Sequence, residues 1–407
     1  MRTGTSNRSV VLSVVAWLLF FCVPVLDQGC VADGAEATQL FLARHWRRPV
    51  PPQGSPPAHD AAAETNLNPV GCALCHASQH TDWQASLHRH AISPGLLGQL
   101  LDMSATALED HQACLRCHAP LAEQAETVAT AIANKDETLG RENDGLTCAG
   151  CHVRQHRYYG PPARTPSTTP PTLQPHGGWT AEPAYEDARF CATCHQFAAD
   201  DPALNGKLLE NTFQEWRQSR HAREGKPCQT CHMPDRRHLW RGIHDPEMVR
   251  SGLAIHADPQ PASPGETALH ILIRNTGVGH YFPTYVTPRV VVEAWQQDLA
   301  NTTLAGTRQE MIIGRDVTLD LTEERFDTRI PPDGQKMFVY HQPRHPQATA
   351  LAWQIRVEPD HFYKLFYEAV LQTASNPQGK HLLQEALHQA QNSPYTLSSG
   401  SLPLALP

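Results

Sequence analysis

The stretch Cys72-Ala73-Leu74-Cys75-His76 contains two cysteines separated by two residues, and a histidine directly follows the second cysteine. The same pattern occurs four more times, at residues 114–118, 148–152, 191–195 and 228–232. This spacing lets both thiols add to the vinyl groups of one porphyrin while the adjacent histidine binds the iron. The five units therefore predict five covalently bound haem c groups.

Disulfide pairs and zinc knuckles also use two cysteines at this spacing, but neither requires a histidine directly after the second one. With 24 histidines in 407 residues, chance would place one after all five pairs with a probability on the order of one in a million. The predicted attachment cysteines are Cys72, Cys75, Cys114, Cys117, Cys148, Cys151, Cys191, Cys194, Cys228 and Cys231. The predicted proximal iron ligands are His76, His118, His152, His195 and His232.

The composition argues against a disulfide-rich protein and against a nucleic-acid-binding protein. Ten of the twelve cysteines lie in the five units, so only Cys22 and Cys30 remain and no disulfide framework is predicted. The formal charge is −8, and haem propionates would make the finished molecule more acidic, which argues against nucleic-acid binding. The length is sufficient for two domains.

The N-terminus has the order of a secretory signal. Arg2 and Arg8 precede an apolar run at residues 10–26, and Ala35-Glu36-Ala37 is a candidate cleavage site. Residues 1–37 are therefore predicted to be a signal peptide or, as the alternative, an uncleaved N-terminal membrane anchor through residues 10–26. A signal peptide and an uncleaved anchor both predict export to the periplasm or the outer cell surface.

The units divide the rest of the chain. A Pro-rich linker is predicted at 38–69 and a pentahaem cytochrome c domain at 70–250. With about one unit per 32 residues from Cys72 to His232, little room remains for a side-chain core. We therefore expect mainly short α-helices and loops around stacked haems.

The pattern of residue types in the sequence changes after residue 250. Short alternating or β-branched runs at 253–257, 268–274, 290–297, 311–315, 336–342 and 350–357 are separated by turn residues. They predict an all-β, immunoglobulin-like sandwich over 251–360. C-terminal helices near 361–373 and 378–391, followed by an extended Pro/Ser/Leu tail, are expected in 361–407.

The sixth iron ligand separates an electron carrier from an enzyme, because a second histidine saturates the iron and an empty position leaves a site for chemistry. A repeat narrows the search: Trp83-x-x-Ser86-x-His88 and Trp216-x-x-Ser219-x-His221 share one pattern. Both stretches are predicted to be helical, and His88 and His221 are predicted to be distal ligands. The alternative is two surface histidines beside packing tryptophans.

Three further histidines are candidate distal ligands. His244 closes the haem segment, His111 lies three residues before Cys114, and His280 lies in a Gly-rich loop between two predicted strands. For each of them an exposed or hydrogen-bonded histidine is an equal alternative. His156 and His176 are weaker candidates.

The order of these motifs resembles the multihaem cytochrome c-554 family, which is related in haem arrangement to hydroxylamine oxidoreductase and pentahaem nitrite reductase. The likeness covers about residues 70–250, including the closing Cys228-Gln229-Thr230-Cys231-His232-Met233-Pro234. It implies closely stacked haems, mostly bis-histidine ligation, a periplasmic or outer-surface location and electron transfer. Family members have four haems and no sandwich, whereas this chain has five units and a β region. No Cys-x-x-Cys-Lys unit, the mark of the nitrite reductase catalytic haem, occurs here.

These sequence features are compatible with two alternative functions. The first is an exported electron carrier that works between redox partner proteins, and it is favoured over a catalyst because no constellation beyond the haems stands out. The second is a multihaem oxidoreductase that acts on a small nitrogen or sulfur compound at one open iron. His156, Tyr158 and Tyr159 could then supply the groups above that iron, although haem-edge packing is the favoured interpretation of these residues.

Overall fold

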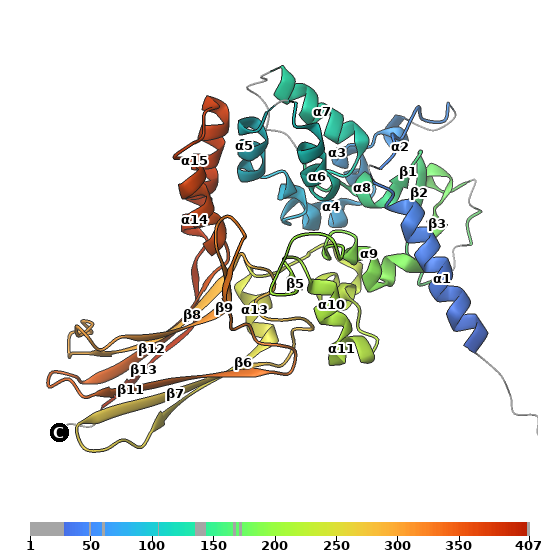
Figure 1. Ribbon diagram of the computed structural model, residues 1–407. Helices are drawn as coiled ribbons and strands as arrows, with labels where there is room; N and C mark the ends of the chain where they lie inside the picture. The colour runs from blue at the N-terminus through green and yellow to red at the C-terminus, as the bar shows by residue number, and fades with distance from the viewer. Residues whose placement is uncertain are drawn as a thin grey trace, which may run out of the picture.

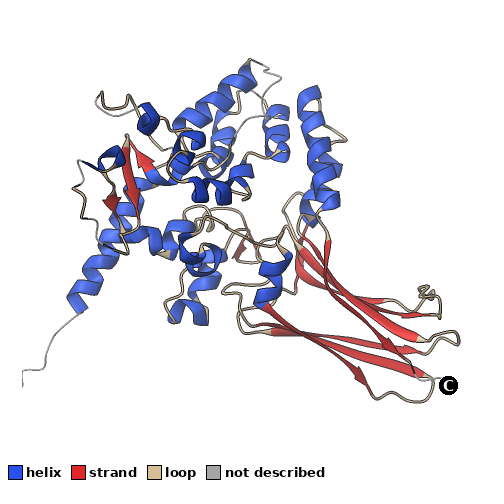
Figure 2. Ribbon diagram, turned by 180° about the vertical axis from the view of Figure 1, so that it is seen from behind, coloured by secondary structure: helices blue, strands red, loops and turns tan. Residues whose placement is uncertain are grey.

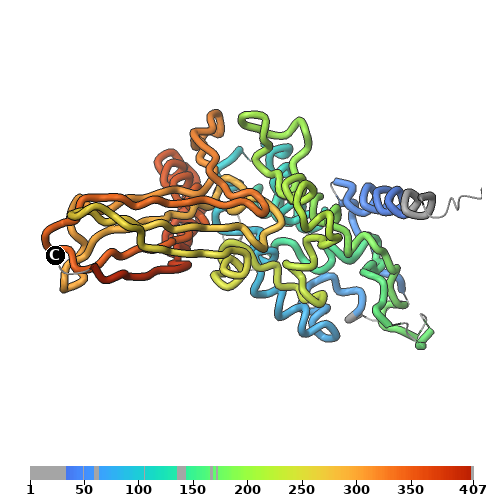
Figure 3. Tube along the Cα trace, turned by 90° about the horizontal axis from the view of Figure 1, so that it is seen from below, coloured from blue at the N-terminus to red at the C-terminus, as the bar shows by residue number. Residues whose placement is uncertain are grey.

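A helical region and a β region make up the computed structural model, which describes residues 28–48, 50–58, 62–104, 106–134, 144–165, 168–170 and 173–404. The β region and helix α1 (Gln28–His45) lie at opposite ends of an elongated molecule (Figures 1 and 3). The apolar run at 10–26 lies outside the described residues, whereas the candidate cleavage site Ala35-Glu36-Ala37 lies within α1. Within the described ranges, none of the helices combines the length and apolar character needed to cross a bilayer.

The helical region consists of short helices, as its sequence predicts. After α1 the α-helices are α2 (Ala62–Thr65), α3 (Pro69–Ala73), α4 (Ala77–Gln84), α5 (Pro94–Asp102), α6 (Leu108–His118), α7 (Ala122–Ala133), α8 (Cys148–His152), α9 (Ala188–Ala192), α10 (Thr212–Arg217), α11 (Arg220–Arg223), α12 (Cys228–His232) and α13 (Pro246–Gly252). The short strands among them are β1 (Val153–Arg154), β2 (Arg157–Gly160), β3 (Thr180–Ala181), β4 (Ala203–Leu204) and β5 (Lys207–Leu208).

Polar caps start several of the helices that carry cysteine units. The side chains of Asn68, Thr147 and Asp187 accept backbone N–H groups at the starts of α3, α8 and α9. Such caps satisfy donors that have no partner inside the helix. Because each of these helices is only one turn long, the cap fixes where each cysteine unit begins to coil.

The segment 38–69 packs against the helical region, although a linker was predicted there. Phe41, Leu42 and Val50 are buried, and Val50 forms a β-bridge with Leu121. Part of this segment therefore belongs to the packed structure of the helical region.

The β region contains two antiparallel sheets. Its strands are β6 (Leu253–Gln260), β7 (Glu266–Asn275), β8 (Arg289–Gln297), β9 (Gln309–Val317), β10 (Glu324–Asp327), β11 (Gln335–Pro343), β12 (Ala350–Glu358) and β13 (Tyr395–Pro403). One sheet has the order β10-β9-β8-β12-β13 and the other the order β11-β7-β6. Both sheets contribute to one core, in which Ile271, Val292, Ile313, Phe338 and Ile355 are buried.

The six predicted strands all occur, and the structure adds two. The C-terminal tail, predicted to be extended, is strand β13, which pairs with β12 along its length. Helix α13 contributes Val249 to the β core, so that core begins slightly before residue 251. Two sheets around one core agree with a sandwich, while the comparison with immunoglobulin domains stays a prediction.

The C-terminal helices α14 (His361–Val370) and α15 (Pro377–Asn392) return from the β region to the helical region. Helix α15 lies beside α5 (Figure 1), and in Figure 2 both stand on the side of the helical region that faces the sheets. Leu382 of α15 joins the buried cluster formed by α5, α6 and α7. The two regions are therefore packed together at this point.

Candidate haem sites

Each cysteine unit is coiled so that its histidine follows directly on a helical turn. In the first and fourth units the histidine N–H donates to the carbonyl of the first cysteine, at 2.9 Å for His76 and 3.0 Å for His195. None of the ten cysteines forms a disulfide. Both thiols of every unit therefore remain available for attachment to a cofactor.

In four of the five units the histidine side chain makes a hydrogen bond through Nδ1. The partners of Nδ1 are the Ala91 carbonyl for His118 (2.6 Å), the Tyr159 carbonyl for His152 (2.8 Å), the Arg241 carbonyl for His232 (2.8 Å) and the Tyr285 hydroxyl for His195 (2.7 Å). A histidine that binds a metal through one ring nitrogen usually donates from the other in this way. This bond leaves Nε2 as the nitrogen with a free lone pair.

Three of these histidines face a second histidine at a nearly constant spacing. The ring centroids are 6.1 Å apart for His152 and His238, 6.2 Å for His195 and His88, and 6.4 Å for His232 and His280. Two imidazoles on opposite sides of one metal ion, with metal–nitrogen bonds of about 2.0–2.1 Å, place their centroids about 6–6.5 Å apart. The spacing of all three pairs fits an iron between the rings.

The paired histidines are uncharged at neutral pH. Burial, helped by neighbouring histidines, lowers the pKa of His88 to about 3 and the pKa of His195 to about 4. Burial also lowers the pKa of His152 and of His280 to about 4, although a backbone hydrogen bond opposes the shift in each. Only the neutral imidazole can bind a metal, so these rings are in the required form.

The repeated Trp-x-x-Ser-x-His motif forms the same structure twice, but its helix ends before the histidine. Trp83 lies in α4 and Trp216 in α10, whereas His88 and His221 follow a break in the helix. The indole N–H groups donate to the carbonyls of Leu146 (2.8 Å) and Lys226 (2.9 Å). A serine side chain bonded to nearby backbone lies at each break: the Ser86 hydroxyl donates to the Trp83 carbonyl, and the Ser219 hydroxyl accepts the Ala222 N–H at the start of α11.

The predicted distal ligands lie in different surroundings. Besides facing His195, His88 has a buried Nδ1 without a partner, as does His221. His111 is 2% exposed, and its Nε2 is buried without a partner. His244 lies 3.0 Å from a carboxylate oxygen of Asp360 through Nε2, so this nitrogen is engaged in an ion pair or hydrogen bond. None of His111, His221 and His244 faces a proximal histidine at the spacing above among the described residues.

Sequence reasoning passed over His238 in favour of His244, six residues later. His238 donates from Nδ1 to the Arg236 carbonyl and turns its ring toward His152. His176, ranked as weak, donates from Nδ1 to the Gly178 carbonyl and lies close enough to His76 to lower the pKa of that ring, after the larger effect of burial. No sequence signal distinguishes these histidines, because each depends on a loop that folds back.

Cysteines of different units meet in pairs. Cys72 and Cys148 lie close enough to shift each other's pKa, as do Cys117 and Cys194, and Cys191 and Cys228. The first unit thus adjoins the third, and the fourth adjoins both the second and the fifth. Arg48 donates to the sulfurs of Cys117 (3.3 Å) and Cys194 (3.2 Å).

Comparison with known proteins finds a family likeness in one part of the helical region. Residues 71–153 match the family model described as cytochrome c554 and c-prime. No curated protein matches the chain. A penta-heme cytochrome c552 from Thermochromatium tepidum has a similar structure, with a TM-score of 0.57 and 17% sequence identity, over 82% of this chain and 97% of that one. The prediction of a multihaem c-type cytochrome similar to the c554 family is confirmed.

The residues of this multihaem cytochrome fit the haem c that the family implies. Paired free thiols, neutral histidines with Nδ1 already bonded, and opposed rings at metal-bridging distance form the donor set that a c-type haem needs. At 17% identity the structural likeness shows the fold alone, and it extends over the β region as well as the helical region.

The residues proposed for chemistry beside the third unit are bonded within the chain. His156 is bonded through Nε2 to the Gly54 carbonyl at 3.0 Å. The Tyr158 hydroxyl donates to the Glu64 carbonyl, and Tyr159 packs on His45 with ring centroids 5.4 Å apart. These contacts favour the packing role that the sequence indicates for them.

Proposed function

We propose that this chain is an exported carrier that binds five haem c groups and passes electrons between redox partner proteins. The observation that carries the proposal is the spacing of three opposed histidine pairs, His152–His238, His195–His88 and His232–His280. A haem held between two histidines takes up and gives up one electron with little rearrangement. His176 is the proposed partner of His76, because it lies near enough to help lower the pKa of that histidine.

The contacts between units support transfer along the molecule. Three pairs of cysteines from different units lie close together, so the attachment points of these units are side by side. In this arrangement the fourth unit, which contacts the second and the fifth, is the proposed junction of the path. The donor and acceptor proteins are expected to dock where attached porphyrin edges reach the surface.

Export is part of the proposal because c-type attachment is completed outside the bacterial cytoplasm, and residues 1–37 have the order of a secretory signal. If the signal remains uncleaved, residues 10–26 would anchor the carrier to the membrane.

A pair of histidine variants tests the ligand assignment. In haem-loaded His238→Ala, the ring opposite His152 is lost, and we expect a new high-spin ferric EPR signal of about one haem equivalent. His244→Ala is the matched control, because Nε2 of His244 is engaged with Asp360 and the variant should keep the wild-type spectrum. A wild-type spectrum for His238→Ala, or a new signal for His244→Ala, would contradict the assignment.

One observation favours oxidoreductase chemistry as a second candidate function. Among the described residues, neither His118 nor His76 has a histidine ring opposite it at the spacing of the three pairs; because His176 is proposed for His76, the iron of the second unit is the proposed open position. Cyanide binding tests this candidate in the wild-type protein. Spectra that stay unchanged with excess cyanide or nitrite in both oxidation states would rule it out.

A further inference from the structure

The loop between β7 and β8 carries His280 from the β region to the haem region. It runs from Asn275 to Arg289 and brings His280 opposite His232, with the two rings nearly parallel at 13°. The same loop carries Tyr285, whose hydroxyl bonds to His195. Two of the five units thus contact side chains that come from outside the segment containing the cysteine motifs.

Contacts from within the β region fix one side of this loop. The buried Asn275 side chain donates to the His280 carbonyl (3.1 Å) and accepts the Val278 N–H (2.9 Å). Phe282 and Ile330 exchange two backbone hydrogen bonds of 2.8 Å. The backbone on both sides of His280 is therefore tied to the sheets.

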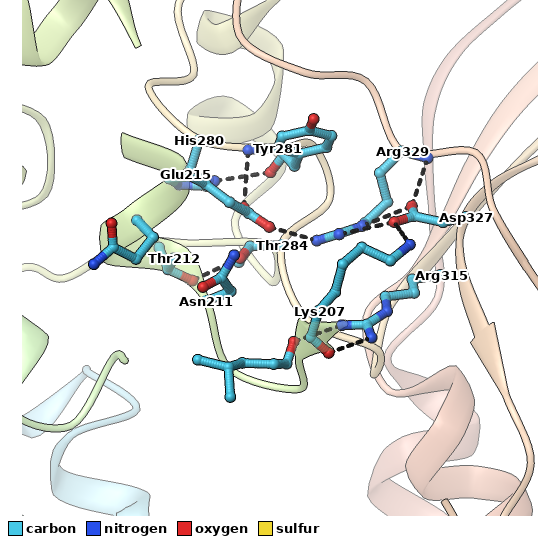
Figure 4. Close-up of polar contacts among 12 residues, drawn as sticks. Lys207, Asn211, Thr212, Glu215, His280, Tyr281, Thr284, Arg315, Asp327 and Arg329 are labelled. Atoms are coloured by element: carbon cyan, nitrogen blue, oxygen red, sulfur yellow. Dashed lines mark hydrogen bonds and ion pairs between the residues drawn. The ribbon is translucent and has the colours of Figure 1, made fainter. Parts of the chain in front are cut away.

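An ion pair with helix α10 fixes the other side. Glu215 of α10 accepts the Tyr281 N–H through Oε2 (3.1 Å) and an Arg329 N–H through Oε1 (2.9 Å), as Figure 4 shows. Both side chains of the pair are almost completely buried, at 5% exposure for Glu215 and 4% for Arg329. The Arg329 guanidinium also stacks over the Tyr281 ring, 5.0 Å from its centroid.

Close packing leaves the loop little freedom against α10 and α11. A Cβ atom added to Gly279 would lie 3.2 Å from the Trp216 ring and 3.4 Å from His221. The residue before His280 therefore has to be small for the loop to approach the haem region this closely.

Burying the Glu215–Arg329 ion pair costs free energy, because both charged groups lose their contact with water. Burial raises the pKa of Glu215 despite the guanidinium beside it, which indicates a desolvation cost. Apolar residues of similar volume often join surfaces equally well, so a buried ion pair is weak evidence for stability and is better explained by a need for one geometry.

We propose that Glu215 and Arg329 are positioning residues that hold His280 as the distal ligand of the haem attached at Cys228 and Cys231. The β region is then a structural part of the haem relay and does more than dock partners or shield one end. This inference rests on the proposed function, since it requires that His232 and His280 bind one iron.

The test compares haem-loaded variants by ferric EPR and by thermal unfolding. The double variant Glu215→Leu/Arg329→Met replaces the pair by apolar groups and removes the acceptor for the Tyr281 N–H, while the interface keeps its volume. We expect a high-spin signal of about one haem equivalent above wild type, which added imidazole reverses. His280→Ala is the reference and should give a signal of the same size. Glu215→Gln retains an oxygen acceptor for the Tyr281 N–H and should remain mostly low-spin.

The Arg315–Glu324 pair supplies the matched control. It is equally buried, at 1% and 6% exposure, and Arg315 donates to the carbonyls of the β4–β5 hairpin in the haem region. It makes no direct contact with the His280 loop and is linked to Arg329 only indirectly, through Lys207 and Asp327. The double variant Arg315→Met/Glu324→Leu should therefore add no high-spin signal.

Each alternative result has a separate meaning. If His280→Ala gains the signal and Glu215→Leu/Arg329→Met does not, the positioning role is overturned while the ligand pair stands. Equal signals from that variant and the control would also overturn it, because general loosening of the interface would then explain both. If His280→Ala itself keeps the wild-type spectrum, the proposed His232–His280 pair fails, and the inference fails with it.

Discussion

Tyr285 is distinctive among the residues that contact the proximal histidines. Three of those histidines bond to backbone carbonyls, whereas His195 bonds to the Tyr285 hydroxyl. Tyr285 has a φ of 64°, in the left-handed region that a bulky residue seldom adopts. Such strain is found where a side chain is held for function.

We expect the Tyr285→Phe substitution to raise the reduction potential of the haem held by His195. Without the hydroxyl as acceptor, Nδ1–H of His195 loses its hydrogen bond, the ring becomes a weaker donor to iron and the ferric state is less stabilised. A hydrogen bond of about 0.5–1.5 kcal/mol corresponds to ~20–60 mV for one electron. A spectroelectrochemical titration would measure this shift.

Tyr159→Phe is the matched control for this prediction. Tyr159 serves His152 through its backbone carbonyl, which the substitution leaves in place. The potentials should therefore stay close to wild type in this variant. Coincident titration curves for Tyr285→Phe and wild type would contradict the role given to the hydroxyl.

At the scale of single residues, the sequence predicts the attachment cysteines and proximal histidines better than the histidines that lie opposite them. The cysteine units identify ten attachment points and five histidines, because covalent attachment demands one local spacing. The opposite ligands are not local. His238 and His244 belong to one stretch, and only the folded loop turns the first toward His152 and the second toward Asp360.

Among the secondary-structure elements, the strands with clear alternation were the most predictable. Strand β7 alternates between partly exposed and buried residues almost throughout, and the sequence predicts it within two residues at each end. Strand β13 was predicted only as an extended tail, because its Ser- and Pro-containing sequence lacks that alternation and its pairing with β12 depends on the tertiary structure.

The crossing of α5 and α15 gives a prediction for a helix pair. A Cβ atom at Gly98 would lie 2.7 Å from Leu383 Cγ and 2.9 Å from the Gly379 carbonyl oxygen. We expect Gly98→Ala to lower the free energy of unfolding by about 1–3 kcal/mol, because the helices must move apart. Denaturant unfolding followed by circular dichroism would measure the change.

Gly242→Ala supplies the comparison at an open position in a loop, since a Cβ atom there meets nothing within 4 Å. Replacing glycine by alanine where the backbone accepts it should make that variant neutral or more stable by up to about 1 kcal/mol. Equal stability of the Gly98→Ala and Gly242→Ala proteins would show that the crossing is not tightly packed.

Three sets of contacts between the two regions stand out at the scale of the whole molecule. They are the α5–α15 crossing, the His280 loop, and a group of charges where the β4–β5 hairpin meets β9 and β10. Neither the hydrophobic pattern nor the cysteine spacing predicts them, because each joins residues far apart in the sequence, such as Glu215 and Tyr281 at 66 positions and Leu208 and Arg315 at 107. The sequence accordingly separates the chain into two domains, whereas the structure packs them together.

The charged group makes the stability of this junction dependent on pH. Burial alone would raise the pKa of Asp327, but hydrogen bonds from Arg329 and Lys207 lower it to about 2. The pKa of an aspartate in the unfolded chain is about 3.9. Because the folded pKa is the lower one, the stabilisation is fully present above pH ~4 and is lost as the pH falls toward about 2.

We expect Asp327→Asn to lower the free energy of unfolding by about 1–3 kcal/mol at neutral pH and to flatten the loss of stability between these two pH values. Urea unfolding at a series of pH values would measure both effects. Asp316→Asn, which breaks a more exposed pair with Arg325, should change stability by less than about 1 kcal/mol. Parallel pH profiles for wild type and Asp327→Asn would mean that this carboxylate does not couple the junction to pH.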